Sequence, residues 1–216
     1  MLTRAGKLSL NIIDSIRFDL GLPHDFILTL LAEFPDYFQI CNMGDDFGLE
    51  LVAWRDDLAT SVLQKRSTEK FPINLPKGFD LEKKVRIWMH EWQNLAYISP
   101  YEDAFFLSPN SDQAEKYTVA VLHELMHLFV SKKTEKENIL ILGDYLGFGP
   151  RFKKALVHHP GIFYVSNKIR TQTVVLREAY KKDLLAERHL LMGMRYRYLH
   201  LMKTKRVRPG TFINAT

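Results

Sequence analysis

The stretch YLGFGPRFKKALVHHPGIFYV, from Tyr145 to Val165, contains the signals for several local structures in order. Gly147 ends one apolar segment, Pro150 opens a second segment, and Pro160 closes it. The apolar and aromatic residues after Pro160 are typical of a β-strand. A helix, a glycine turn, a second helix and then strands follow the order of a helix-turn-helix with a β-hairpin wing.

An earlier stretch, DLGLPHDFILTLLAEFPDYFQI from Asp19 to Ile40, repeats this pattern. Any helical hairpin followed by strands looks roughly alike, but here individual glycine, phenylalanine and proline positions coincide. Such self-similarity favours a true internal repeat. The matches at an offset of 126 residues are Leu20/Leu146, Gly21/Gly147 and Phe26/Phe152, and after a one-residue gap they are Pro35/Pro160, Phe38/Phe163 and Ile40/Val165.

The rest of the chain is predicted from periodicity, caps and breakers. Helices are expected at 8–19, 26–34 (with Asp25 as N-cap), 56–65, 81–92, from Ser111 or Asp112 onward, at 135–146, at 150–159 and at 184–203. Hairpin strands are expected at 38–42 with 48–54, and at 162–166 with 173–178. The predicted fold class is α+β, mainly α, with two winged-helix-like units (helix-turn-helix plus β-hairpin) joined by a helical middle segment. The predicted boundaries are a leader at 1–7, unit one at 8–66, the helical middle at 67–134, unit two at 135–183, a basic helix at 184–203 and a tail at 204–216.

Composition excludes several classes of protein. Hydrophobic residues make up 46% of the 216 residues, which is enough to fill a core and argues against wholesale disorder. A single cysteine, Cys41, excludes an internal disulfide and any cysteine-rich zinc module. No apolar run reaches the roughly 18 residues that a membrane helix needs, so no membrane contact is expected. Residues 1–7 are basic but lack an apolar core, so we expect no transit peptide within this chain.

Charge is distributed unevenly along the sequence. Residues 1–150 carry 15 Lys and Arg against 22 Asp and Glu, a net charge of −7, whereas residues 151–216 carry 15 against 3, a net charge of +12. A basic segment attached to an acidic one indicates a surface for a polyanion, although a solvated basic tail is the plainer alternative. The candidate RNA-binding residues are Arg151, Lys153, Lys154, Lys168, Arg170, Arg177, Lys181 and Lys182, with Lys83, Lys84 and Arg86 beside Trp88 and Trp92 as a further group.

The segment AVLHELMHLF, Ala120 to Phe129, contains the H-E-x-x-H pattern of zinc hydrolases. In such enzymes the two histidines bind zinc and the glutamate acts as general base. Here the apolar stripe of the helix excludes His123 and His127, which predicts that both lie on a solvated face. No third ligand is evident, since Lys133 stands where the longer signature needs a histidine and Glu178 would have to fold back onto this helix. We therefore expect no catalytic residue, no metal and no cofactor.

Several strings resemble the plant organelle RNA recognition domain family, in the order of that family and over nearly the whole chain. They are RFDLGLPHDF, LELVAW, FPINLPKGF, WQNLAYISPYED, SDQAEKYTVAVLHELMHL, HHPGIFYVS and TVVLREAY. The resemblance implies a nuclear-encoded protein of plant mitochondria or chloroplasts, with mitochondria favoured. It implies binding to group II intron RNA, promotion of splicing without catalysis, and other splicing factors as partners. In the family pattern VLHEL is typical but the second histidine is not.

Two other function classes remain alternatives. One is a zinc-dependent hydrolase that uses His123, Glu124 and His127. The other is a tandem winged-helix module that binds DNA or docks on a protein, and competition between RNA and DNA would separate it because only RNA offers 2′-hydroxyl groups.

Overall fold

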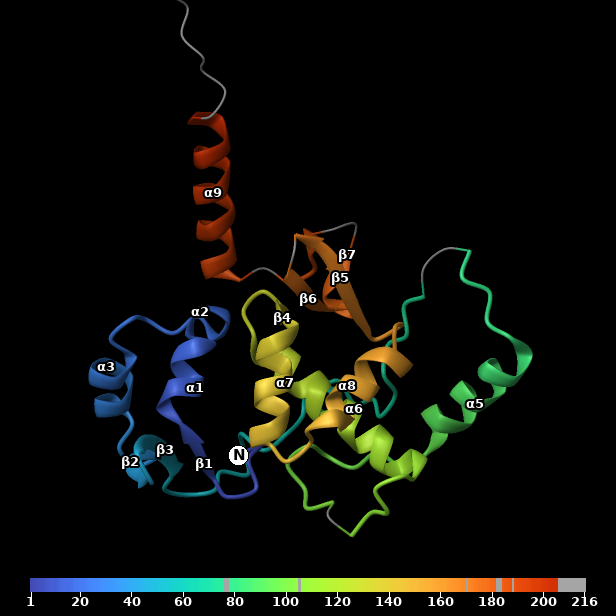
Figure 1. Cartoon of the computed structure of the whole chain (residues 1–216), viewed down its shortest axis with the longest axis horizontal. Helices are drawn as coiled ribbons and strands as arrows, with labels where there is room; N and C mark the ends of the chain where they lie inside the picture. The colour runs from blue at the N-terminus through green and yellow to red at the C-terminus, as the bar shows by residue number, and fades with distance from the viewer. Residues whose placement is uncertain (76–77, 105, 170, 182–183, 188, 206–216) are drawn as a thin grey trace, which may run out of the picture.

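The fold is described by a computed structural model over residues 1–205, apart from 76–77, 105, 170, 182–183 and 188. The chain is α+β and mainly helical, which confirms the predicted class, and small antiparallel sheets flank the helices (Figure 1). The candidate residues Arg170 and Lys182, and positions 206–216 of the predicted tail, lie outside the described residues.

Unit one consists of a strand, three short helices and a hairpin, and its sheet has the order β1-β3-β2. The prediction of one helix at 8–19 is wrong: Lys7, Leu8 and Ser9 pair with β3, and the helix is interrupted at Ile16. The helix begins late because the Ser9 side chain accepts a hydrogen bond from the Asn11 amide and so acts as N-cap. The elements are β1 (Lys7–Ser9), α1 (Leu10–Ser15), α2 (Arg17–Leu20), α3 (Phe26–Glu33), β2 (Phe38–Met43) and β3 (Asp46–Leu51).

Unit two has the same order of a short strand, helices around a glycine turn, and a hairpin. Its sheet order, β4-β6-β5, again places the first strand beside the last. The matched glycines have nearly the same backbone, with φ of 74° at Gly21 and 78° at Gly147, a left-handed conformation that favours glycine. The elements are β4 (Lys133–Glu135), α7 (Lys136–Tyr145), α8 (Pro150–His158), β5 (Phe163–Ile169) and β6 (Thr171–Leu176).

The middle segment contains α4 (Val62–Lys65), α5 (Lys83–Asn94) and α6 (Asp112–Leu128). The prediction of a helix from Asp56 to Lys65 is wrong, because the helix begins only after Ser61, which forms a capping box with Gln64. The predicted cap of the long helix is confirmed, since the Ser111 side chain accepts a hydrogen bond from the Ala114 amide.

Helix α6 is the centre of the core. In Figure 1 unit one lies on one side of it and α5 on the other, while α8 packs against it and α7 packs against α8. Every residue from Thr118 to Met126 on α6 is buried, including the polar ones. A helix that is covered all round must pair its polar side chains inside the protein, and those of α6 do so.

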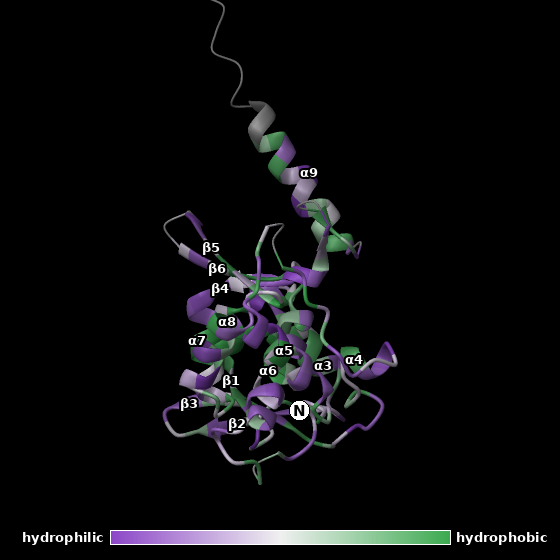
Figure 2. Cartoon of the chain, turned by 90° about the vertical axis from the view of Figure 1, so that its right-hand side faces the viewer, coloured by the Kyte–Doolittle hydropathy of each residue, from purple (hydrophilic) through white to green (hydrophobic). Residues whose placement is uncertain are grey.

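The C-terminal part consists of a 3-10 turn η1 (Arg177–Ala179), strands β7 (Tyr180–Lys181) and β8 (Leu184–Leu185), and helix α9 (Leu190–Lys205). The predicted helix start at 184 is wrong, because Leu184 and Leu185 pair with β7. Helix α9 projects from the body, held at its base by the Arg195 guanidinium, which lies 3.7 Å from the centroid of the Phe18 ring (Figures 1 and 2). Of the helices in the described ranges, none has the length and apolar character that crossing a bilayer requires.

Candidate nucleic-acid interface

The start of α8 carries three of the candidate RNA-binding residues, Arg151, Lys153 and Lys154. Arg151 is half-buried: its guanidinium lies 5.3 Å from the centroid of the Phe148 ring, and its Nη2 donates to the Gly147 carbonyl at 2.9 Å. The Arg151 side chain therefore stabilises the turn at Gly147. Lys153, by contrast, is exposed and has no hydrogen-bond or ion-pair partner among the described residues.

Lys154 is exposed but paired with an acidic group. Its Nζ lies 3.1 Å from Glu115 Oε2 on α6, and Glu115 Oε1 lies 3.2 Å from His158 Nδ1 and 2.9 Å from His159 Nε2. The hydrogen bond with His159 is the main cause that lowers the pKa of Glu115 to about 2, against the opposing effect of burial. The carboxylate is thus ionised at neutral pH and offsets the charge of Lys154, which weakens its attraction for phosphate.

Of three more candidate cations, two have exposed, unpaired side chains among the described residues, and the third is hydrogen-bonded within the protein. Lys168 near the end of β5 and Lys181 in β7 have exposed side chains, with no partner among the described residues. Arg177 instead donates through Nε to the Pro160 carbonyl at 2.5 Å, and its guanidinium lies 5.0 Å from the centroid of the Tyr164 ring. Lys153, Lys168 and Lys181 are therefore the candidate RNA-binding lysines between residues 135 and 183 that are exposed and, among the described residues, unpaired.

Helix α5 presents Lys83, Lys84 and Arg86 to solvent, and Arg86 pairs with Asp80 at 3.2 Å. Trp92 is not an open platform for bases. Trp92 is only 1% exposed and lies in the core, which confirms the packing alternative.

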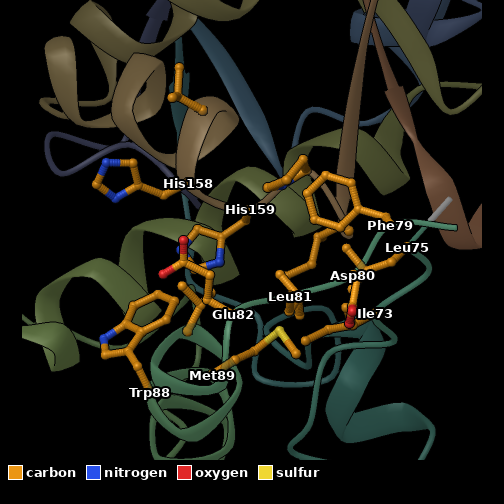
Figure 3. Close-up of a pocket in the computed structure, with 15 residues that line it drawn as sticks. Ile73, Leu75, Phe79, Asp80, Leu81, Glu82, Trp88, Met89, His158 and His159 are labelled. Atoms are coloured by element: carbon orange, nitrogen blue, oxygen red, sulfur yellow. The ribbon is translucent and has the colours of Figure 1, made fainter.

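A pocket of about 350 Å³ separates α5 from the end of α8. Figure 3 shows Trp88 and His159 on its wall, with Asp80 and Glu82 at the same pocket. An apolar, aromatic pocket suits an unstacked base, but two carboxylates disfavour a phosphate there. The exposed lysines of unit two are therefore the stronger candidates for backbone contact.

The HELMH segment does not lie on a solvated face. His123 and His127 have side chains only 2% and 7% exposed, so that expectation is wrong. The turn η1 brings Glu178 over α6, with its Oε1 3.2 Å from His123 Nε2 and 2.7 Å from His127 Nε2. The argument that no third ligand is available is wrong as well. Burial raises the pKa of Glu178. The hydrogen bonds and charges of the two histidines lower this pKa by a larger amount, so that it lies well below its usual range.

Glu124, the would-be general base of that motif, has a different position. Its Oε2 accepts from the Val62 amide at 2.9 Å and its Oε1 accepts from the Tyr101 hydroxyl at 3.0 Å. Both oxygens are thereby occupied by protein donors. The arrangement gives Glu124 a structural role and does not support water activation.

Helix α9 carries exposed aromatic residues that the list of candidates omitted. Tyr196 and Tyr198 are 43% and 64% exposed, and Arg197 between them is exposed too. Exposed aromatic rings beside a guanidinium can stack on unpaired bases. The sequence signal for this surface was the Tyr-Arg-Tyr triplet. A helix packed along its length on the body could carry the same triplet, so the sequence alone does not distinguish packing residues from RNA-binding residues. The projecting position of α9 favours RNA-binding residues.

Comparison with known proteins assigns the sequence of this chain to a family. The profile of the plant organelle RNA recognition domain matches residues 1–207. The chain is 36% identical to "Protein WHAT'S THIS FACTOR 9, mitochondrial" of Arabidopsis thaliana, over 94% of the chain and 56% of that protein. It is 29% identical to "Protein WHAT'S THIS FACTOR 1, chloroplastic" of Zea mays, over 95% of the chain and 45% of that protein.

A third relative is "Protein ROOT PRIMORDIUM DEFECTIVE 1" of Arabidopsis thaliana, 32% identical over 87% of the chain and 51% of that protein. No solved structure matches the chain. The chain spans about half the length of the curated relatives it matches. Because the family profile covers almost all of its residues, the chain belongs to the plant organelle RNA recognition domain family.

Proposed function

We propose that this chain binds group II intron RNA in a plant organelle and promotes its splicing without chemistry of its own. The observation that carries the proposal is that three candidate lysines, Lys153, Lys168 and Lys181, are exposed and unpaired among the described residues, in a chain of this family. Cations of this kind attract the phosphate backbone and give affinity without sequence choice.

In the proposed mechanism the protein holds the intron in a splicing-competent fold, and the RNA supplies the catalysis. Helix α8 and the β5–β6 hairpin of unit two act as a winged helix on the RNA backbone, while unit one keeps the same order of elements for packing. The exposed Tyr196 and Tyr198 on α9 add stacking with unpaired bases, which is how proteins select single-stranded RNA.

The names of the relatives support a proposal on location. The relative at 36% identity carries the word mitochondrial in its name, and one at 29% carries chloroplastic, so we favour mitochondria. Other splicing factors are proposed as partners, because the resemblance to this family implies them.

The zinc hydrolase alternative is disfavoured by one contact pattern. A general base needs a free carboxylate oxygen beside the metal-bound water, and both oxygens of Glu124 accept hydrogen bonds from protein groups. The alternative of a tandem winged-helix module that binds DNA is tested by comparing the binding of RNA and DNA.

The test is sequencing of the RNA that co-purifies with a tagged chain from plant mitochondria and chloroplasts. Enrichment of group II intron sequences is expected, and enrichment of no RNA class over an untagged control would refute the proposal. Binding of one intron segment as RNA and as DNA of the same sequence, at several salt concentrations, identifies the ligand class. A preference for DNA would favour the alternative module.

A further inference from the structure

Three side chains with metal-ligating atoms meet beside α6: His123, His127 and Glu178. Each offers one ligand atom, and these atoms lie within 4.8 Å of one another. The three side chains are 2%, 7% and 7% exposed. We propose that this cluster binds one divalent transition-metal ion, with zinc as the best match, and that the ion has a structural role.

The spacing of the ligand atoms fits a metal site. Histidines four residues apart on a helix present their rings on one face, and the two ring centroids here are 4.6 Å apart. A tetrahedral ion with bonds of about 2.0–2.1 Å places its ligand atoms about 3.3 Å apart. The distances of 3.2 Å and 2.7 Å from the two Nε2 atoms to Glu178 Oε1 are already close to that value. Small rotations of the side chains would admit the ion.

The second oxygen of Glu178 supports a ligand more directly. Glu178 Oε2 is buried and has no hydrogen-bond partner within the described part of the chain. Buried carboxylate oxygens are normally paired, since burial without a partner costs free energy. Bidentate coordination by Glu178 would engage this oxygen, and together with His123 and His127 it would supply four donor atoms.

Two cations lie at the cluster: Arg66 contacts its carboxylate, and Lys132 donates through Nζ to the backbone carbonyl of His127. Arg66 Nη1 lies 2.9 Å from Glu178 Oε1, and Arg66 Nη2 lies 3.6 Å from Glu187 Oε1 on the exposed side. A metal-ligating carboxylate often keeps a hydrogen bond from an outer group. Arg66 can therefore remain as such a group or turn toward Glu187, whose side chain is 69% exposed.

The ligands of the cluster are buried from solvent, and this burial favours a structural role for the ion over a catalytic one. Structural zinc sites are fully ligated by the protein, whereas catalytic sites keep an open position for water or substrate. Here the ligands are buried and the adjacent Glu124 is occupied by Val62 and Tyr101. The ion would fasten the segment after β6 to the central helix, and thereby join unit two to the middle of the protein.

Zinc titration of the chelator-treated full chain tests the proposal at pH 7.5. We expect one zinc per chain by elemental analysis after gel filtration, and a higher melting temperature with zinc than without it. Glu178→Gln keeps the shape and an acceptor oxygen but removes the charged ligand, so its zinc affinity should fall at least about 100-fold. The matched control is Glu187→Gln, which alters the other carboxylate at Arg66 and should bind zinc as the unmodified chain does.

A network held by hydrogen bonds alone predicts different results. In that case zinc is not retained, the melting temperature does not respond to zinc, or Glu178→Gln and Glu187→Gln bind zinc equally, and each of these outcomes overturns the proposal. If Glu178→Gln does not fold, His127→Gln provides a second variant with the same expected loss. Cobalt(II) added to the unmodified chain gives a variant-free measurement, because a tetrahedral site absorbs strongly in the visible range and the absence of that band also refutes the site.

Discussion

The hydroxyl of Tyr101 donates a hydrogen bond of 3.0 Å to Glu124 Oε1, which joins the loop before α6 to the middle of that helix. The other oxygen of Glu124 accepts from the Val62 amide at the start of α4. One buried carboxylate thus connects three segments that are distant in sequence. Burial raises the pKa of the Tyr101 hydroxyl, and the neighbouring Glu124 charge raises it further, so the tyrosine remains a donor at neutral pH.

Tyr101→Phe should therefore destabilise the protein. The change removes the donor and leaves a buried carboxylate oxygen of Glu124 unpaired, which costs about 1–3 kcal/mol. The measurement is the free energy of unfolding in urea. The control is Tyr145→Phe on α7, whose side chain is 51% exposed, and its effect should stay within about 0.5 kcal/mol. Equal losses from the two variants would contradict the proposed role of Tyr101.

Local signals predicted the elements that depend on nearby residues. Gly21 and Gly147 adopt the left-handed conformation that a glycine turn needs, and Ser111 caps α6 as its position indicated. Where local signals compete, the prediction was wrong. Asp56 did not open a helix because its carboxylate accepts from Trp54 Nε1, and Asp57 pairs with Arg55 in the same turn.

The sequence could not predict that polar residues of α6 are buried. A helical wheel separates apolar from polar residues, but a polar side chain paired inside the protein looks the same as one in water. His123 is buried because the segment after β6, more than 50 residues later, covers it with Glu178. Lys116 is buried because it lies against the end of α5. Both placements depend on contacts between segments that are distant in the chain.

Lys116 gives a second prediction. Its Nζ donates to the carbonyls of Gln93 and Leu95 at 3.0 and 2.5 Å, and so satisfies groups at the C-terminus of α5. Lys116→Met should leave those carbonyls without this donor and destabilise the protein by about 2–3 kcal/mol. Amide hydrogen exchange should quicken most in α5. The exposed Lys84→Met in α5 is the control, and faster exchange in that variant too would argue that Lys116 has no special role.

The pKa of Glu115 gives a third prediction, on acid stability. Its folded-state value of about 2 lies below the ordinary value of 4.5, so the ionised carboxylate stabilises the folded state above about pH 4.5. This contribution is lost as the pH falls from about 4.5 toward 2, because the carboxylate then takes up a proton. We expect the free energy of unfolding to fall over that window.

Glu115→Gln isolates this effect from the other carboxylates. At pH 6 the variant should be less stable by about 1–3 kcal/mol, because it loses charged hydrogen bonds with His159 and Lys154. The difference from the unmodified chain should shrink as the pH approaches 2. A difference that stays constant from pH 6 to pH 2 would show that the ionisation of Glu115 does not contribute to stability.

The last prediction concerns the RNA surface. Arg151 is tied to the glycine turn and Lys154 to Glu115, so changing either one would disturb the fold as well as the charge. Lys153, Lys168 and Lys181 are exposed and, among the described residues, unpaired, which makes them the cleaner test. Replacing all three by Glu should weaken RNA binding at least about tenfold, or about 1.4 kcal/mol. The slope of log affinity against log salt should fall by about 2, since fewer counterions are released.

Two comparison variants locate the effect. Leu28→Glu adds a negative charge to α3, the helix of unit one that corresponds to α8, at a side chain that is 79% exposed. It should change RNA affinity far less than the triple variant, because α3 contains no lysine or arginine. Lys83→Glu with Lys84→Glu alters α5 instead. If this pair weakens binding while the triple variant does not, with circular dichroism showing every variant folded, the RNA lies across α5 and the assignment to unit two is wrong.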